Sequence, residues 1–425
     1  MKKFLAAVLL VVLLVPSVAF AEGFGVYEWS ATGTAMGDNF MFDEEDAAVL
    51  AYNPAGITHL KGKHLSFGAT WFNPAIKCHF NNTPGGLNQK FGTTSHKNNS
   101  YDPVWAGSIF YTQQLSDKYW WGLGIFPRFG NGISFSSGWE GRYDTLFSKI
   151  TGITIQPTIA YKPHDKWSLA AGIDINYVKL QMDKTLPVTH PTYGYLGDSF
   201  FSLEGSTTKV GWFVSAMYDF DKNNSAAITY RSKIKHNMDA DVSTSDVAPY
   251  VSGTNTKAHG SVTLPESVAL GFGHKFNDRT RIEFDATWTN WTSYDALNLT
   301  FDEPLFGMVS SSENPKDWNA VWRFGVGFQH RMNEKWTFLC GYNFDASPVP
   351  DKTFDFTVPT GDRHRGSFGF KYNINKDAAI TLAYTAIWAG SRDALSKVES
   401  KDFTSAHVND CLTQILSLGF SMKLK

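Results

Sequence analysis

The sequence is poor in cysteine and in charge, and both scarcities exclude classes of protein. It has 3 cysteines in 425 residues, 18% of its residues are charged, and its formal net charge is -2 at pH 7. Three cysteines do not make the disulfide framework of a small secreted domain, and their spacing fits no zinc motif. This charge balance gives no electrostatic footprint for nucleic acid, which would need a concentrated basic patch, so we expect no nucleic-acid partner.

Long apolar runs are also missing after the first residues. No later stretch approaches 18 consecutive apolar residues, which excludes a helical membrane protein. At the start, two lysines precede an apolar run over 4–15, and Ala19 and Ala21 supply small residues at the cleavage positions. We expect residues 1–21 to be a secretory signal peptide. The alternative is a membrane anchor, but the run is shorter than the roughly 20 residues that a spanning helix needs.

Motifs of common enzymes are absent. The sequence has no Gly-x-Ser-x-Gly, no His-Glu-x-x-His and no P-loop, and its 12 histidines are scattered. A hydrolase would need a nucleophile within reach of a base, and the sequence shows no such pattern. We therefore expect no catalytic residues, no metal site and no cofactor.

What the sequence does contain is a repeated pattern of apolar and polar residues. Stretches of about ten residues alternate in this way, as the strands of a membrane β-barrel do. We expect fourteen strands, near 65–73, 104–115, 119–129, 151–162, 166–180, 207–220, 225–237, 263–276, 279–291, 318–332, 335–345, 363–374, 378–389 and 411–424.

The connections between these strands alternate in length. Six are tight and polar, and seven are long and irregular, at 74–103, 130–150, 181–206, 238–262, 292–317, 346–362 and 390–410. This alternation is typical of an antiparallel barrel with short periplasmic turns and long outer loops. A soluble β-sandwich is the alternative, but it would not usually need so regular an alternation.

Side-chain facing follows from the period of two. In 166–180, Leu169 and Ile173 share a face that we expect to meet lipid, and Asp174 and Asn176 share the lumenal face. An interfacial girdle of tryptophans is expected near the strand ends, at Trp120, Trp121, Trp167, Trp318, Trp322 and Trp336.

A turn motif lies ahead of the first strand. In Asn53-Pro54-Ala55-Gly56, the proline lacks a backbone donor and the glycine permits unusual backbone angles, so the preceding apolar run must end there. An ordinary turn is the alternative. From its position we expect a plug, with residues 22–62 forming an N-terminal hatch and 63–425 the transmembrane barrel.

Several motifs together resemble the FadL/TodX family of outer-membrane transporters for long-chain fatty acids and other hydrophobic compounds. They run from Glu22-Gly-Phe-Gly-Val-Tyr-Glu-Trp-Ser-Ala-Thr-Gly33 and Asn53-Pro-Ala55 through Tyr230-Arg-Ser232, Leu264-Pro-Glu266, Asn290-Trp-Thr-Ser-Tyr294, Trp336-Thr-Phe338, Phe344-Asp-Ala-Ser-Pro-Val-Pro350 and Pro359-Thr-Gly-Asp-Arg363. The resemblance covers essentially the whole chain after residue 21. It implies an all-β, fourteen-stranded barrel closed by an N-terminal hatch, with ligand captured outside and released sideways through a distorted strand.

The function expected from this resemblance is passive uptake across the outer membrane of a Gram-negative bacterium. The ligand would be a fatty acid, an aromatic compound or an alkane. Expected partners are outer-membrane lipid and lipopolysaccharide and the barrel-assembly machinery, and the expected state is a monomer. A general porin and an outer-membrane enzyme are the alternatives, but about forty residues precede the first strand and can plug the lumen.

Two sites follow from the motifs and the resemblance. Phe24 matches the aromatic residue of the family that reaches into the ligand pocket. In Phe126-Pro127-Arg128-Phe129-Gly130, proline removes a ladder hydrogen bond and glycine allows a bulge, so we expect an opening in the wall there. The alternative is that the strand ends at Pro127. We expect the Asn53 turn to face this irregularity.

A fatty-acid carboxylate in an apolar pocket needs a cation. Lys184 and Lys179 match positions where the family has basic residues, although by parity Lys179 should lean outward and solvated lysines are the alternative. Arg231, Lys233 and Lys235 are a further expected lumenal lining.

The cysteines are expected to be structural. Cys78 and Cys411 flank the seam that closes the barrel and could form a disulfide there. Cys340 is expected to be a small apolar residue of the wall.

Overall fold

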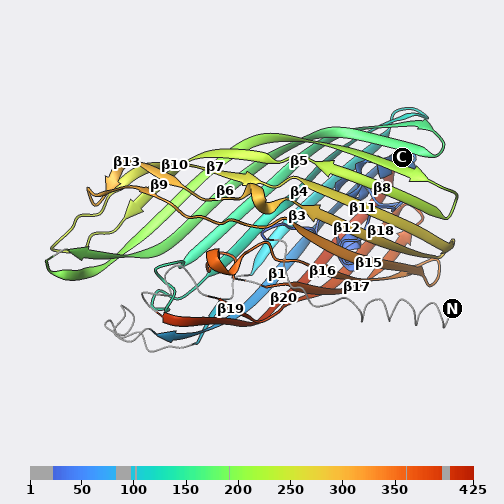
Figure 1. The fold of residues 1–425 in the computed structure, drawn as a ribbon. Helices are drawn as coiled ribbons and strands as arrows, with labels where there is room; N and C mark the ends of the chain where they lie inside the picture. Colours follow the sequence, from blue (N-terminus) through green and yellow to red (C-terminus); the bar gives the residue numbers. More distant parts are fainter. Residues whose placement is uncertain (1–22, 83–96, 101–102, 191, 360, 395–402) are drawn as a thin grey trace.

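The computed structural model of the chain describes residues 23–82, 97–100, 103–190, 192–359, 361–394 and 403–425. The expected signal peptide, residues 1–21, lies outside these ranges. Figure 1 shows a long barrel of tilted strands, with short helices inside it near the end that carries the C-terminus.

Within the described ranges, fourteen antiparallel wall segments close the barrel, which confirms the expected fold. Twelve are single strands: β1 (Lys63–Asn82), β3 (Val104–Gln114), β4 (Tyr119–Ser134), β5 (Phe147–His164), β6 (Trp167–His190), β7 (Gly194–Asp219), β12 (Thr280–Thr289), β15 (Val321–Arg331), β16 (Trp336–Asp345), β17 (Arg363–Asn375), β18 (Ala378–Ala389) and β20 (Phe403–Leu424). Two are broken in the middle: β8 (Asn224–Arg231) with β9 (Ile234–Thr244), and β10 (Asn255–Leu264) with β11 (Ser267–Asn277). Pairing of β1 with β20 closes the barrel.

Short elements complete the outer end of the barrel. They are β2 (Lys97–Ser100), β13 (Leu299–Leu305), β14 (Val309–Ser312), β19 (Arg392–Ala394) and the 3₁₀ turns η2 (Trp291–Ser293) and η3 (Asp351–Thr353). β2 pairs with β1, β13 with β10 and β14, and β19 with β20.

The expected facing of the strands is confirmed. Ile173 is 42% exposed on the outer face, whereas its neighbour Asp174 is 1% exposed on the lumenal face. The girdle was partly wrong, because Trp120 and Trp318 are buried. Trp120 points inward and donates its indole N–H to the Leu60 carbonyl at 2.9 Å.

Two segments expected as irregular loops, 181–206 and 238–262, are largely strand, which corrects the sequence interpretation. β6 and β7 remain paired up to His190 and Gly194 and project beyond the rest of the barrel (Figure 1). β9 pairs with the outer part of β7. Buried and exposed side chains continue to alternate through 238–244. Met238 is buried because the interior of the projecting part is also apolar.

The break between β8 and β9 overturns the expected facing of two lysines. Arg231 and Ile234 are both buried although they are three positions apart, whereas inward residues of one strand are two positions apart. The two residues between them therefore reverse which positions face the lumen. Lys233, within the break, and Lys235, beyond it, are exposed instead of lumenal.

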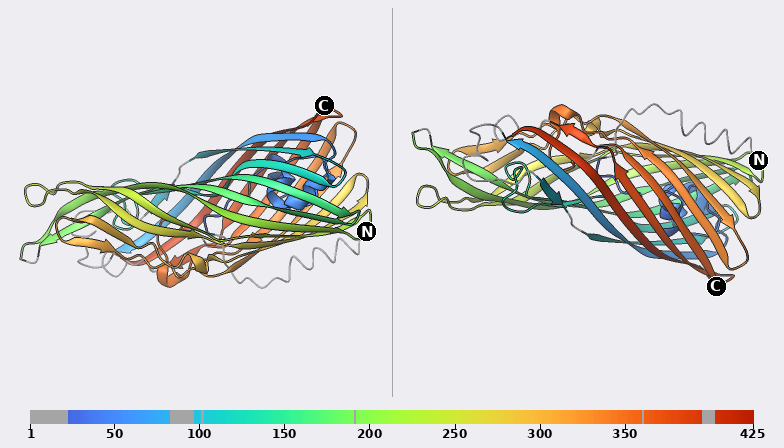
Figure 2. Two further views of the ribbon diagram at one scale, coloured as in Figure 1. Left: turned by 90° about the horizontal axis from the view of Figure 1, so that it is seen from above. Right: turned by 90° about the horizontal axis from the view of Figure 1, so that it is seen from below.

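The N-terminal segment, residues 23–62, lies inside the barrel. It contains α2 (Ala31–Ala35), α3 (Val49–Tyr52) and the 3₁₀ helix η1 (Pro54–His59). Both views of Figure 2 show these blue helices surrounded by strands. Most side chains of the segment are buried, and they form one apolar cluster with inward residues of the wall such as Phe126 and Met217.

Candidate functional site

Phe24 lies in a cluster of aromatic rings in the lumen. Its side chain is 2% exposed. The rings around it belong to Trp291, Tyr294, Trp318 and Phe129, with centroid distances of 4.6, 5.6, 5.7 and 6.1 Å. Edge-to-face contacts dominate, as expected for packed aromatic rings. The cluster joins the N-terminal segment to β4 and to the segment between β12 and β15.

The backbone around Phe24 pairs with β4. Val26 N–H donates to the Arg128 carbonyl at 3.0 Å, and Gly130 N–H donates to the Phe24 carbonyl at 2.9 Å. A bridge joins Gly25 to Phe129. The structure therefore brings together two sites that the sequence predicted separately, Phe24 and the Phe126–Gly130 stretch.

β3 and β4 separate along their outer halves. Their pairing runs from Gln114 and Trp120 to Ile109 and Ile125 and ends there, although both strands continue. The pairing of β4 with β5 shifts register between Pro127 and Phe129, so a bulge is centred on Arg128, close to the expected irregularity. The strand does not end at Pro127 but bends there, and the N-terminal segment pairs with the edge it leaves.

A cavity of about 490 Å³ occupies this separation. On the lumenal side it touches Gly25, Arg365 and Ile387, and on the side of the separated strands it touches Trp105 and Pro127. Trp105 is 71% exposed on the outer face. The cavity therefore reaches from the lumen into the gap between β3 and β4.

The Asn53 motif is fixed by hydrogen bonds, but not to β4. Asn53 is fully buried; its amide N–H donates to the Met41 carbonyl at 2.8 Å and its amide oxygen accepts from Ser215 Oγ at 2.9 Å. Ser215 lies on β7, so the expectation that this turn faces the third-strand irregularity was wrong. Pro54 begins η1, and that turn aims the Asn53 side chain at β7.

A ring pathway nevertheless connects the motif to β4. Tyr52, which precedes Asn53, packs on Trp29 at 4.9 Å between ring centroids, and Trp29 packs on Phe126 at 5.2 Å. Phe126 is fully buried. The N-terminal segment thus contacts β4 both at Phe24 and at Phe126.

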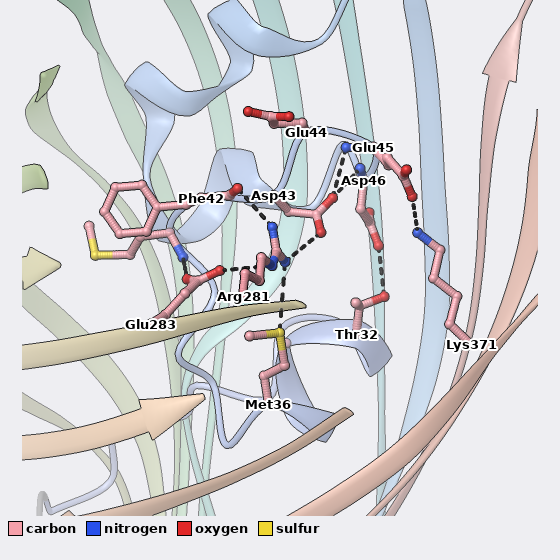
Figure 3. Close-up of polar contacts among 12 residues, drawn as sticks. Thr32, Met36, Phe42, Asp43, Glu44, Glu45, Asp46, Arg281, Glu283 and Lys371 are labelled. Carbon is pink, nitrogen blue, oxygen red and sulfur yellow. Dashed lines mark hydrogen bonds and ion pairs between the residues drawn. The ribbon is translucent and has the colours of Figure 1, made fainter. Parts of the chain in front are cut away.

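Ion pairs hold the N-terminal segment to the wall through the acidic run 43–46 (Figure 3). Asp43 accepts a hydrogen bond from Arg281 Nη2 at 2.7 Å, and Glu45 accepts one from Lys371 Nζ at 2.8 Å. Asp43 and Arg281 are both buried, and breaking one partner of a buried pair is strongly destabilising, by roughly 3–5 kcal/mol. This middle part of the segment is therefore anchored to the wall.

A buried charge triad lies beneath the aromatic cluster. Asp174 on β6 accepts hydrogen bonds from Arg128 Nη1 at 2.8 Å and from Arg231 Nη1 at 3.0 Å. Arg231 also donates to the Ala51 carbonyl at 2.7 Å. Arg231 is lumenal as predicted, but it fixes the bulge residue Arg128 to the wall and to the N-terminal segment.

A second cluster of charges lies at the outer side of Phe24. Lys316 and Asp355 form a buried salt bridge, and Lys316 and Phe24 line a small cavity of about 20 Å³. Although burial opposes it, Asp355 raises the pKa of Lys316. Burial lowers the pKa of Lys184, which feels the charges of Lys316, Asp144 and Asp355. Burial, and then the neighbouring Asp355, raises the pKa of Asp144 to about 7.

The two predicted lysines lie in different surroundings. Lys184 is on the inward face of β6, with its ammonium 5.7 Å from the centre of the Phe201 ring. Lys179 leans outward, as parity predicted, and its Nζ lies 2.5 Å from Glu204. The structure therefore joins Lys184, but not Lys179, to the charges near Phe24.

The cysteines lie near the seam but are not in register. Backbone pairing places Cys78 opposite Val408, whereas Cys411 lies opposite Ala389 of β18. Cys411 is buried, and the side chain of Cys78 is outside the described residues. The Cys78–Cys411 disulfide stays a prediction. Cys340 is a partly buried residue of β16.

Sequence reasoning missed several residues of the site. Trp291 and Tyr294 stood in a quoted motif, but nothing in the local pattern assigned them to Phe24. Lys316 and Asp355 come from segments expected as plain loops. Only the tertiary fold brings these residues together, since they are far apart in the sequence.

The described part of the chain offers no site for a metal ion and no membrane-spanning helix. Among the described residues, no group of three or more histidine, cysteine or acidic side chains is placed to hold a metal ion. In the same part of the chain, no helix combines the length and apolar character needed to cross a membrane.

Comparison with known proteins gave a match to one family along almost the whole chain. The family described as outer membrane protein transport protein (OMPP1/FadL/TodX) matches residues 12–417. The long-chain fatty acid transport protein of Salmonella typhi is 24% identical over 405 residues, which cover 89% of this chain and 90% of that protein. Outer membrane protein P1 of Haemophilus influenzae is 21% identical, with 90% of each chain covered.

Solved structures share the fold. A FadL homologue of Pseudomonas aeruginosa superposes with a TM-score of 0.84 at 19% identity, covering 95% of this chain and all of that one. The toluene transporter TbuX of Ralstonia pickettii gives a TM-score of 0.69 at 18% identity, covering 94% of this chain and all of that one.

Proposed function

The chain belongs to the OMPP1/FadL/TodX family of outer membrane transport proteins, and from that premise we propose that it takes up hydrophobic small molecules and releases them sideways through the wall between β3 and β4. The protein is a β-barrel of the Gram-negative outer membrane. Relatives include transporters of long-chain fatty acids and of toluene, and a ligand of this apolar class suits the present cavity.

The observation that carries this proposal is the cavity of about 490 Å³ that reaches from the lumen into the gap between β3 and β4. Most of its lining is apolar, as in the pockets that bury small ligands. Paired strands give a membrane barrel a closed wall, and ending the pairing at Ile109 and Ile125 leaves this wall locally unpaired. A ligand in the cavity is thereby in contact with both the lumen and the side of the barrel.

We infer that Phe24 gates the path and that the rest of the N-terminal segment acts as a fixed hatch. Two backbone hydrogen bonds and ring packing hold Phe24 beside β4. Ion pairs of the run 43–46 and of Glu28 with Arg365 fix the rest of the segment, whereas ring packing and backbone hydrogen bonds hold Phe24 itself. Transport needs only a concentration gradient and the affinity of apolar walls for the ligand.

An acidic ligand would place its carboxylate beside Lys316 and Lys184. A buried carboxylate is costly without a cation; Lys316 lines the small cavity beside Phe24, and Lys184 is close enough to feel the charge of Lys316. The acyl chain would then follow the aromatic cluster toward the β3–β4 gap.

The outer surface of the barrel indicates which molecules surround the protein. Its outer face exposes apolar side chains such as Val210 and Leu382, which would contact lipid and, in the outer leaflet, lipopolysaccharide. We propose that the barrel is inserted by the barrel-assembly machinery and works as a monomer, because one chain closes the wall.

The test is a substitution that fills the cavity. A Cβ on Gly130 would lie 3.3 Å from Val26 Cγ2, so the indole of Gly130→Trp must extend into the cavity. We expect uptake of a radiolabelled hydrophobic probe to fall at least about tenfold in cells that lack their own transporter of this family.

Val210→Trp is the control, because it adds the same indole to the lipid-facing surface of β7. It should take up the probe at the rate of the unaltered protein. Heat-modifiability gels establish that the Gly130→Trp barrel is folded. Normal uptake by this folded variant would contradict the proposed exit.

A further inference from the structure

Basic residues line the cavity at both of its ends. Arg363 and Arg365 of β17 reach it from the lumenal side, and Lys149 of β5 reaches it from the wall. Glu28 is the acidic residue that contributes to the same lining. The path from the lumen to the wall is thus apolar along its length but cationic at each end.

Lys149 lies on the outer face of the wall beside the gap. It shares the face of β5 that exposes Ile153 and Ile155, at 40% and 39%, whereas its neighbour Ser148 is buried toward the lumen. Opposite it on β4 stands Gly132, and opposite Thr151 stands Gly130. Without side chains on those β4 residues, the groove beside Lys149 remains open.

The basic residues at the two ends of the cavity differ in their hydrogen bonds and ion pairs. Arg365 is held by Glu28 at 2.8 Å and by Asp38, and Arg363 donates to the Gly23 carbonyl at 3.0 Å. For Lys149, the described residues supply no hydrogen bond or ion pair. An ammonium group beside an apolar groove gains most from an anionic partner, through a charge-assisted hydrogen bond.

We propose that Lys149 is a specificity-determining residue at the exit, which pairs with the carboxylate of an amphipathic acid as the acid leaves through the β3–β4 gap. The inference rests on the proposed function and names its substrate class, which is long-chain carboxylic acids in preference to neutral hydrocarbons. A carboxylate that leaves the cations of the lumen would otherwise cross an apolar wall unpaired, at a large cost in free energy. Lys149 removes that cost at the point where the wall is open.

The test compares two probes with the same acyl chain, the anion oleate and its neutral methyl ester, methyl oleate. In Lys149→Met, we expect oleate uptake to fall about tenfold, because the carboxylate loses a charge-assisted partner, whereas methyl oleate uptake stays unchanged. Lys149→Arg should retain oleate uptake, since it keeps a cation at the mouth. Heat-modifiability gels establish that each variant is folded.

Lys179→Met is the matched control. Thr151 pairs with Lys179 and Lys149 pairs with Gln181, so Lys179 is an outward lysine at nearly the same height on the adjacent strand. It is engaged by Glu204 and does not line the cavity. Its loss should leave both probes unaffected.

Two results would overturn the inference. Equal effects of Lys149→Met on oleate and methyl oleate would mean that the lysine shapes the wall and does not pair with the carboxylate. Equal effects of Lys149→Met and Lys179→Met would mean that outer lysines act through lipopolysaccharide. Failure of the proposed function looks different, because the unaltered protein would then take up neither probe.

Discussion

At the residue scale, the site combines apolar rings with a few charges that cannot easily be hydrated. Phe24 is enclosed by aromatic rings, and Lys316, which is paired with Asp355 and felt by Lys184, lines a small cavity with it. Lys316 and Asp355 lie in segments between wall strands, and Lys184 lies on the outer part of β6. Burial, and then Asp355, raises the pKa of Asp144 to about 7. The net charge of this cluster therefore changes near neutral pH, when Asp144 gains or loses its proton.

That balance predicts a pH dependence of ligand binding. Below pH 7 Asp144 is protonated, so the two lysines and Asp355 leave a net positive charge beside the small cavity. A fatty-acid carboxylate stays largely ionised at pH 6, so we expect its affinity to rise about three- to tenfold between pH 8 and pH 6. Titration of purified protein with oleate at several pH values measures this change.

Two comparisons isolate Asp144 in that experiment. Asp144→Asn should bind oleate with the low-pH affinity throughout, and methyl oleate should show no pH dependence with either protein. A folded-state pKa above the ordinary value means that Asp144 favours the folded state at low pH, and this contribution is lost as the pH rises from about 4 through about 7. An oleate affinity that is flat from pH 6 to pH 8 would contradict the assignment.

At the scale of elements, β4 and the N-terminal segment work as a pair. The bulge at Arg128 directs the outer half of β4 away from β3, and residues 24–26 of the N-terminal segment pair with β4 there. The segment is anchored elsewhere by the acidic run 43–46. The buried Glu28–Arg365 pair also fixes the segment just after Val26, so loss of the backbone hydrogen bonds to β4 would loosen only the few residues around Phe24.

Val26→Pro tests this pairing. Proline removes the N–H that donates to the Arg128 carbonyl, so the strand of residues 24–26 should detach from β4 and withdraw Phe24. We expect affinity for a hydrophobic ligand to fall about tenfold, and the fluorescence of the neighbouring Trp291 and Trp318 to change. Val26→Ala keeps the N–H donor and serves as the control. If both variants bind ligand equally well, the backbone pairing does not position Phe24.

At the scale of the whole molecule, the barrel is longer than a membrane requires. β6 and β7 have 24 and 26 residues, whereas about 9–11 residues suffice to cross the bilayer. The projecting parts enclose an apolar core that includes Phe24 and the rings around it. The proposed ligand path therefore begins above the membrane and turns sideways at the β3–β4 gap.

The sequence predicted much of this architecture, because strands that face lipid on one side and the lumen on the other must alternate. The facing of Ile173 and Asp174 shows this. The lengths of β6 and β7 were missed because outer loops were assumed to be irregular, and Lys233 and Lys235 were misplaced because a break between strands switches faces without a signature in the pattern.

Individual site residues were harder to predict than the fold. Phe24 and Gly130 came from a family motif and from backbone chemistry, and the fold brings them together. Lys149 and Lys316 look like ordinary surface lysines in the sequence. Their surroundings depend on where β4 bends and on how distant segments meet, and neither leaves a local pattern.

The measurement that tests lateral exit most directly is a reversible clamp across the gap. A Cβ on Gly132 would lie 3.5 Å from Val104 Cγ2, so Val104→Cys with Gly132→Cys places two thiols within disulfide reach of each other across β3 and β4. Cys78, Cys340 and Cys411 are first replaced by serine. We predict that uptake of the hydrophobic probe is lost on oxidation and restored by reductant, whereas full uptake through the oxidised, cross-linked barrel would contradict exit through this wall.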